Sequence, residues 1–188
     1  MSGTVTDVLA FAAKYTDYWD EILDGEPTYD SVLSAEELKA FEAARVHINE
    51  SVYDLLKLCG DKLTECARLD KQEFPMPRFQ RDKTQQKRRV QVLKQATNPG
   101  KIYGAFFSLE GNADGVVKLY ASVSVYKEII ESVKDSLKTE GVEFGEYDGY
   151  CIYSPGIELK QSLPFSALAE KAAQHLWKFL ISVRKQAG

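Results

Sequence analysis

The sequence predicts an α+β protein: an antiparallel sheet of four to five strands, in a strand-strand-helix, strand-strand-helix order, preceded by an N-terminal helical hairpin. Two observations support this fold class. Up to about residue 67 the apolar residues recur at a spacing of three and four, which indicates amphipathic helices. From residue 102 the period changes to two, and turn-forming residues separate short alternating runs, which indicates strands. The chain of 188 residues has the length of one ordinary domain.

The sequence predicts that residues 1–73 form a helical arm of two antiparallel helices. Either Thr4 or Thr6 stands where the first helix needs a capping side chain. The second helix is expected to begin after Ser34, because Ser34 and Glu37 have the spacing of a capping box. Its apolar stripe continues over many turns, so this helix is the longest that the sequence predicts.

The sequence predicts that residues 74–101 form a basic linker and helix. The Phe-Pro-Met-Pro sequence at its start cannot continue a helix, since proline lacks the backbone amide. Residues 78–101 have eight basic and one acidic side chain, whereas residues 1–73 have 7 basic and 16 acidic ones. A helix is expected over residues 83–96. The two segments therefore have opposite net charge, which bears on their partners.

The sequence predicts that residues 102–188 form the α+β domain. Two strands are joined by a glycine-rich loop and followed by a helix, and a hairpin with Asp148-Gly149 as its two-residue turn comes next. A short strand and a final helix complete the chain. Aromatic residues fall on both faces of the first strand, with Phe107 on one and Phe106 on the other. This pattern predicts that the sheet is covered on its second face as well, by the N-terminal helices or by a partner.

Several common chemistries lack their sequence motif. The chain has no P-loop, no dinucleotide-binding glycine fingerprint and no nucleophile elbow. Its three cysteines are an odd and sparse set, which favours free thiols and the reducing cytoplasm, and no metal site or cofactor is predicted. A secretory signal is not recognisable, and no run of about 18 apolar residues predicts a transmembrane helix.

Asp148, Glu158 and Lys160 have the residue types and spacing of a magnesium-dependent nuclease site. In such a site the carboxylates hold Mg²⁺ and the lysine positions or polarises the attacking water. Residues 126–180, with Glu128 and Glu131 on the preceding helix, resemble part of the PD-(D/E)xK nuclease fold in the order of their elements. The resemblance implies phosphodiester cleavage, with Mg²⁺ as the metal.

A structural interpretation of the same residues stands beside the catalytic one. The Asp148-Gly149 pair is explained by the geometry of a tight turn. Glu158 and Lys160 fall on one side of a short strand and Ile157 and Leu159 on the other, as on any strand with one face in solvent. This interpretation is favoured over the nuclease.

The basic segment is the second candidate site. Cations spaced along a polar segment suit a phosphate backbone, where each contributes by counterion release. Phe74 and Phe79 are candidate stacking residues beside it. The alternative is that the acidic arm attracts the basic segment, within one chain or between two. The candidate nucleic-acid-binding residues are Arg81, Lys83, Lys87, Arg88, Arg89 and Lys94.

The leading functional hypothesis is a non-enzymatic, cytoplasmic protein that binds another macromolecule as a regulatory, accessory or inhibitor protein. Its contact surfaces would be the helical arm and the basic segment, and the partner a protein or a second copy of the chain. The alternatives are the magnesium-dependent nuclease and a nucleic-acid-binding protein without cleavage. No membrane partner is expected.

Overall fold

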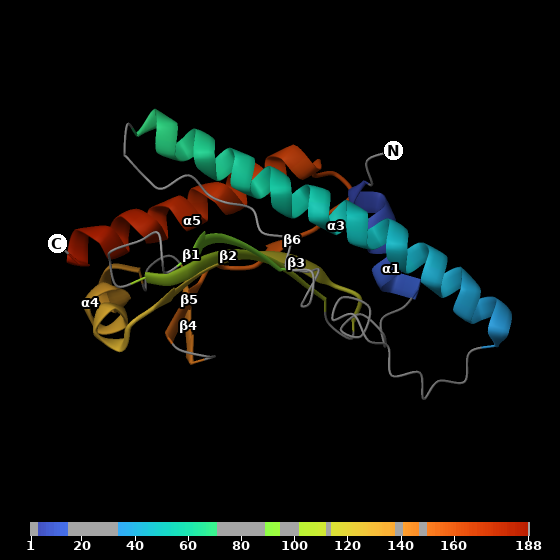
Figure 1. Cartoon of the computed structure of the whole chain (residues 1–188), viewed down its shortest axis with the longest axis horizontal. Coiled ribbons are helices and arrows are strands. Elements are labelled where there is room, and N and C mark those ends of the chain that lie inside the picture. The colour runs from blue at the N-terminus through green and yellow to red at the C-terminus, as the bar shows by residue number, and fades with distance from the viewer. Residues whose placement is uncertain are drawn as a thin grey trace.

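The computed structural model describes residues 4–14, 34–70, 89–94, 102–111, 114–137, 141–146 and 150–187 (Figure 1). It combines helices with one antiparallel sheet, so the predicted α+β class is confirmed. The helices are α1 (Val5–Lys14), α3 (Ala35–Leu69), α4 (Lys127–Leu137) and α5 (Phe165–Ala187). The strands are β1 (Arg89–Lys94), β2 (Ile102–Gly111), β3 (Val117–Val125), β4 (Glu143–Glu146), β5 (Tyr150–Tyr153) and β6 (Ile157–Glu158).

The sheet has the strand order β1-β2-β3-β5-β4, and β6 pairs with β3 outside this path. The two predicted hairpins, β2–β3 and β4–β5, are both present. In the second hairpin Glu146 is the partner of Tyr150, so three residues join the strands where the sequence predicts two. Three-residue hairpin connections also favour glycine, and the Asp148-Gly149 pair therefore did not distinguish the two lengths.

The prediction of a helix over residues 83–96 is wrong where the structure describes it. Residues 89–94 form β1, with Val90 opposite Phe107 and Leu93 opposite Ala105. Val90 and Leu93 are three residues apart, a spacing that also suits a helix. In β1 the register shift between Gln91 and Leu93 places their partners, Phe107 and Ala105, on the same side of β2. Pairing with β2 outweighs the local preference, as sheet formation commonly does. Residues 83–88 lie outside the described part of the chain.

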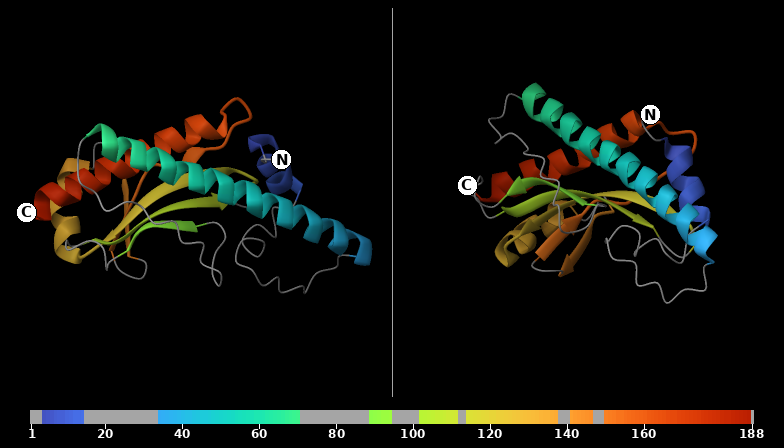
Figure 2. Two further views of the ribbon diagram at one scale, coloured as in Figure 1. Left: turned by 45° about the horizontal axis from the view of Figure 1, so that its top comes forward. Right: turned by 45° about the vertical axis from the view of Figure 1, so that its right-hand side comes forward.

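Helices α3 and α5 lie side by side on one face of the sheet (Figures 1 and 2). The start of α1 borders residues 54–61 of α3, and Phe11 stacks on Phe41 at a centroid distance of 6.3 Å. Since Phe11 follows the start of α1 and Phe41 precedes residues 54–61, the two helices run in opposite directions, as the sequence predicts.

One hydrophobic core contains residues of α1, α3, α4, α5 and the sheet. Val52, Leu55, Leu176 and Leu180 are fully buried in it. The helical segment therefore shares its core with the sheet instead of projecting from it. The predicted boundaries after residues 73 and 101 fall outside the described residues.

Both N-terminal helices begin with the predicted type of cap. The Ser34 hydroxyl accepts from the Glu37 amide, and the Glu37 carboxylate accepts from the Ser34 amide at 2.9 Å. Thr4 and Asp7 make the same reciprocal pair at the start of α1. The hydrogen bonds from the backbone of Ser34 and Thr4 lower the pKa of Glu37 and Asp7.

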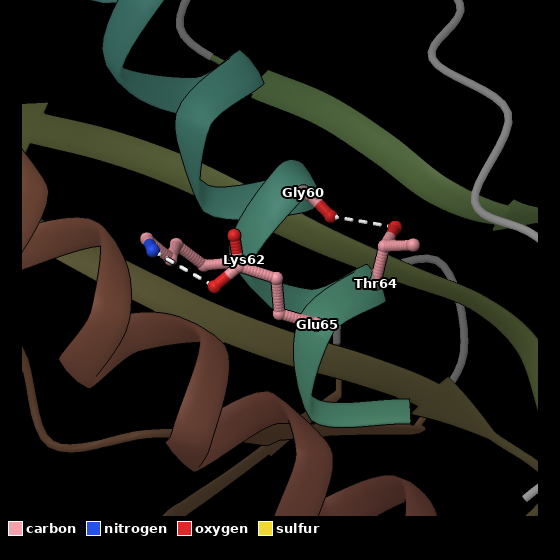
Figure 3. A network of polar contacts seen from close by, with 4 residues as sticks. All are labelled: Gly60, Lys62, Thr64 and Glu65. Atoms are coloured by element: carbon pink, nitrogen blue, oxygen red, sulfur yellow. Dashed lines mark hydrogen bonds and ion pairs between the residues drawn. The ribbon is translucent and has the colours of Figure 1, made fainter. Parts of the chain in front are cut away.

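Helix α3 continues through Gly60 to Leu69. The Thr64 hydroxyl donates to the Gly60 carbonyl at 3.0 Å, and Lys62 pairs with Glu65 at 2.8 Å on the surface (Figure 3). At the end of the helix the indole N–H of Trp177 donates to the Asp70 carboxylate. This contact joins the end of α3 to α5.

Ser154 continues the contact with β3 directly after the end of β5. Its hydroxyl accepts from the Ala121 amide at 2.9 Å, its own amide donates to the Ala121 carbonyl at 2.8 Å, and it is fully buried. The side chain thus satisfies a backbone donor in the gap between β5 and β6.

The Ser154→Ala variant is expected to lose about 1–3 kcal/mol of unfolding free energy, because the buried Ala121 amide is left without an acceptor. Urea denaturation followed by circular dichroism measures the loss. Ser132→Ala on the exposed side of α4 is the matched control and should stay within about 0.5 kcal/mol of the parent. Equal denaturation midpoints for the two variants would contradict the role assigned to Ser154.

Candidate functional site

Glu158 and Lys160 lie on the solvent side of the segment that contains β6. The Lys160 ammonium is 4.0 Å from the Glu158 carboxylate, and the side chains are 59% and 49% exposed. Ile157 and Leu159, on the other side, are buried. This alternation matches the structural interpretation of the two residues, and such an exposed ion pair contributes little to stability.

The described pairing places Tyr150 and Glu158 at different positions along β3. Tyr150 pairs with Val125 and Glu158 with Lys118, so the two partner positions are seven residues apart along β3, about 23 Å of strand. Asp148 lies outside the described residues. Within the described ranges, no group of three or more His, Cys, Asp or Glu side chains is placed to hold a metal ion.

Glu128 and Glu131 are exposed on α4. This helix packs on α5 and β5, whereas Glu158 pairs with the other end of β3. The two helical glutamates therefore do not join Glu158 and Lys160 in one site.

The basic segment is described only in its last part. Arg89 and Lys94 are the end residues of β1, with Ser108 and Gly104 as their respective partners on β2. The other four candidates, Arg81, Lys83, Lys87 and Arg88, lie outside the described residues. Where the structure describes it, at residues 89–94, the basic segment is therefore an edge strand of the sheet and not a helix.

Neither Cys59 nor Cys66 has the environment of a reactive thiol. Cys59 is fully buried, and this burial raises the pKa of its thiol. Burial and the nearby Asp70 carboxylate also raise the pKa of Cys66. A nucleophilic cysteine needs a lowered pKa, so both thiols are assigned to packing.

An open pocket of about 550 Å³ lies on the helical side of the molecule. It is lined by the start of α1, the middle of α3 and the segment of residues 161–165. Its size is in the range of ligand-binding clefts, about 300–1,000 Å³. Sequence analysis did not find this pocket, because its three walls are about 50 and 100 residues apart along the chain.

The lining of the pocket combines an apolar floor with a charged rim. Leu58 and Phe165 are half-buried, and Leu163 and Pro164 extend the apolar surface between them. On α3 the exposed residues Asp54, Lys57 and Asp61 recur at helical spacing along the same wall. Thr4, Thr6 and Gln161 add side chains that donate and accept hydrogen bonds. The arrangement suits an apolar group with polar atoms around it.

The chain matches no family model, no curated protein and no solved structure. Among the helices in the described part of the chain, none has the length and apolar character needed to cross a membrane. The geometry of the surfaces is therefore the basis for assigning a function.

Proposed function

We propose that the protein is a non-enzymatic, macromolecule-binding protein that recognises a partner protein through its helical layer. The supporting observation is the pocket between α1, α3 and the segment before α5. An apolar floor beside charged and polar groups is the usual setting for an anchor side chain at a protein interface. The anchor would be a large apolar or aromatic residue of the partner.

The outer face of α3 extends this surface. Glu50, Asp54 and Asp61 are exposed along it, together with Lys57. Towards the start of the helix, Val46 is 59% exposed. The anchor would enter the pocket while basic residues of the partner face the acidic side chains of α3. Such charges raise the association rate and select among partners more than they increase affinity.

Photo-crosslinking tests this proposal. A photoreactive amino acid replaces Lys57 at the pocket rim, and the adducts formed in the source cells are identified by mass spectrometry. We expect one major adduct, and we expect the purified partner to bind the Leu58→Asp variant about tenfold or more weakly, since a charge is placed in the apolar floor.

The matched control places the same photoreactive residue at Glu131, which is exposed on α4 at the other end of the molecule (Figure 1). Adducts at Glu131 equal to those at Lys57 would count against the pocket. So would an unchanged affinity of the Leu58→Asp variant, provided that circular dichroism shows that this variant is folded.

A further inference from the structure

The face of the sheet opposite α3 and α5 is a second surface with its own chemistry. Along β3 the residues Val117, Leu119, Ala121, Val123 and Val125 are fully buried and form the face under the helices. The central strands β2 and β3 have α3 and α5 as their main helical neighbours, both on that one face. The prediction that the N-terminal helices cover the second face is therefore wrong for α3, because α3 lies on the same side as α5. The other option, a partner, stays open.

Three aromatic side chains gather on this second face. Phe106 and Tyr153 are the partners of Ser122 on either side of β3. Tyr120 precedes Ser122 by two residues and so shares its face. The three rings are part-exposed, whereas Ser122 between them is 3% exposed. We call Phe106, Tyr120 and Tyr153 the aromatic cluster.

Two glycines leave room for the tyrosine rings. A Cβ atom on Gly156 would lie 2.7 Å from the Tyr120 ring, and one on Gly145 would lie 3.2 Å from the Tyr153 ring. Both distances are shorter than ordinary carbon contacts. Each ring therefore rests against bare backbone, which fixes its position on the sheet.

This face has charges of both signs, and on β2 the exposed Glu110 stands opposite Lys118 and accepts from the Ser108 hydroxyl at 3.3 Å. On the β1 side, Arg89 stands opposite Ser108 and Lys94 opposite Gly104, in register with the second face. On the other side Glu143 stands opposite Tyr153, and Glu158 stands opposite Lys118. Burial, with the nearby carboxylates of Glu110 and Glu143, raises the pKa of Tyr120, so its hydroxyl remains a neutral donor.

We propose that this face binds single-stranded nucleic acid. The phosphates would follow the basic strand β1, and the bases would stack on Phe106 and reach Tyr120 and Tyr153. Stacking on aromatic side chains beside a basic track is the way in which open sheets bind unpaired strands. The basic segment and the aromatic strands are separate features of the sequence, and the pairing of β1 with β2 makes them neighbours.

Fluorescence anisotropy with labelled oligonucleotides of about 15 nucleotides tests the proposal on the full chain. Single-stranded DNA, single-stranded RNA and a DNA duplex are compared across a salt series. We expect the unpaired strands to bind more tightly than the duplex, and the DNA and RNA arms identify the preferred sugar. Phe106→Ala should weaken binding about tenfold, the loss of one stacked base.

The double variant Arg89→Gln, Lys94→Gln should reduce the salt slope by about one to two. Gly156→Ala should weaken binding without any change of charge, because the added methyl displaces the Tyr120 ring. Tyr126→Ala is the matched control: Tyr126 is exposed at 37% and lies outside the aromatic cluster. This variant should bind like the parent.

No binding of either unpaired strand at low salt would overturn the proposal. Equal binding of duplex and single strands would also overturn it, as would an unchanged affinity of a folded Phe106→Ala variant. If Phe106→Ala instead abolishes the protein adduct formed at Lys57, the aromatic cluster is a protein interface and the proposal is wrong. The pocket on the helical side is tested separately, so the failure of one proposal leaves the other standing.

Discussion

A fragment of residues 89–188, which lacks α1 and α3, is expected to be unfolded at 25 °C. In the full chain α3 packs along α5 and also contacts β1 and β2. Without it, the side chains of α5 and the sheet that face α3 meet water. The entropic cost of ordering the rest of the fragment is unchanged by the truncation.

The packing of α3 contributes a free energy comparable with the net stability of a domain. Described apolar residues of α3 that are buried in the core number seven: Phe41, Ile48, Val52, Leu55, Leu56, Cys59 and Leu63. At about 1.5–3 kcal/mol for each side chain, their burial contributes on the order of 10–20 kcal/mol before entropy is subtracted. The net stability of a domain is only about 5–15 kcal/mol.

Circular dichroism and amide proton dispersion of the purified fragment measure this outcome. The matched control is co-expression of residues 1–88 with residues 89–188 as two chains. These should form a folded complex, because together they restore the α3–α5 contact. A fragment that folds alone and unfolds cooperatively would show instead that the sheet with α4 and α5 is an autonomous domain.

Local signals predicted the parts of the fold that depend on neighbouring residues. The capping box at Ser34 and Glu37, the hairpin between β2 and β3 and the helix at Phe165–Ala187 each follow from a short sequence pattern. Gly141, which follows α4 in the chain, has a φ of 69°, the left-handed conformation that glycine favours. Such features need no knowledge of the tertiary structure.

The remaining features depend on segments that are distant in the sequence. Val90 and Leu93 have a spacing that suits a helix, and only the presence of β2 makes residues 89–94 a strand. The walls of the pocket come from three such segments, and so do the rings around Ser122. Sequence analysis identified the basic segment and the aromatic strands, but it had no means of placing them side by side.

The Phe107→Ala variant is expected to lose about 3–5 kcal/mol of unfolding free energy, because it leaves a cavity in the core. Phe107 is fully buried and faces α3 and α5, whereas the adjacent Phe106 is part-exposed on the opposite face. Phe106→Ala should therefore lose no more than about 1–2 kcal/mol. Urea denaturation of both variants gives the comparison.

Variants of these two neighbouring residues distinguish an effect on stability from an effect on binding. If the aromatic cluster binds unpaired nucleic acid, Phe106→Ala loses affinity while the protein stays folded, and Phe107→Ala loses stability while its folded fraction still binds. Anisotropy measured at a temperature where both variants are folded distinguishes the two effects. If Phe106→Ala is as destabilised as Phe107→Ala, the second face is a packed core surface, and a binding role for Phe106 loses its physical basis.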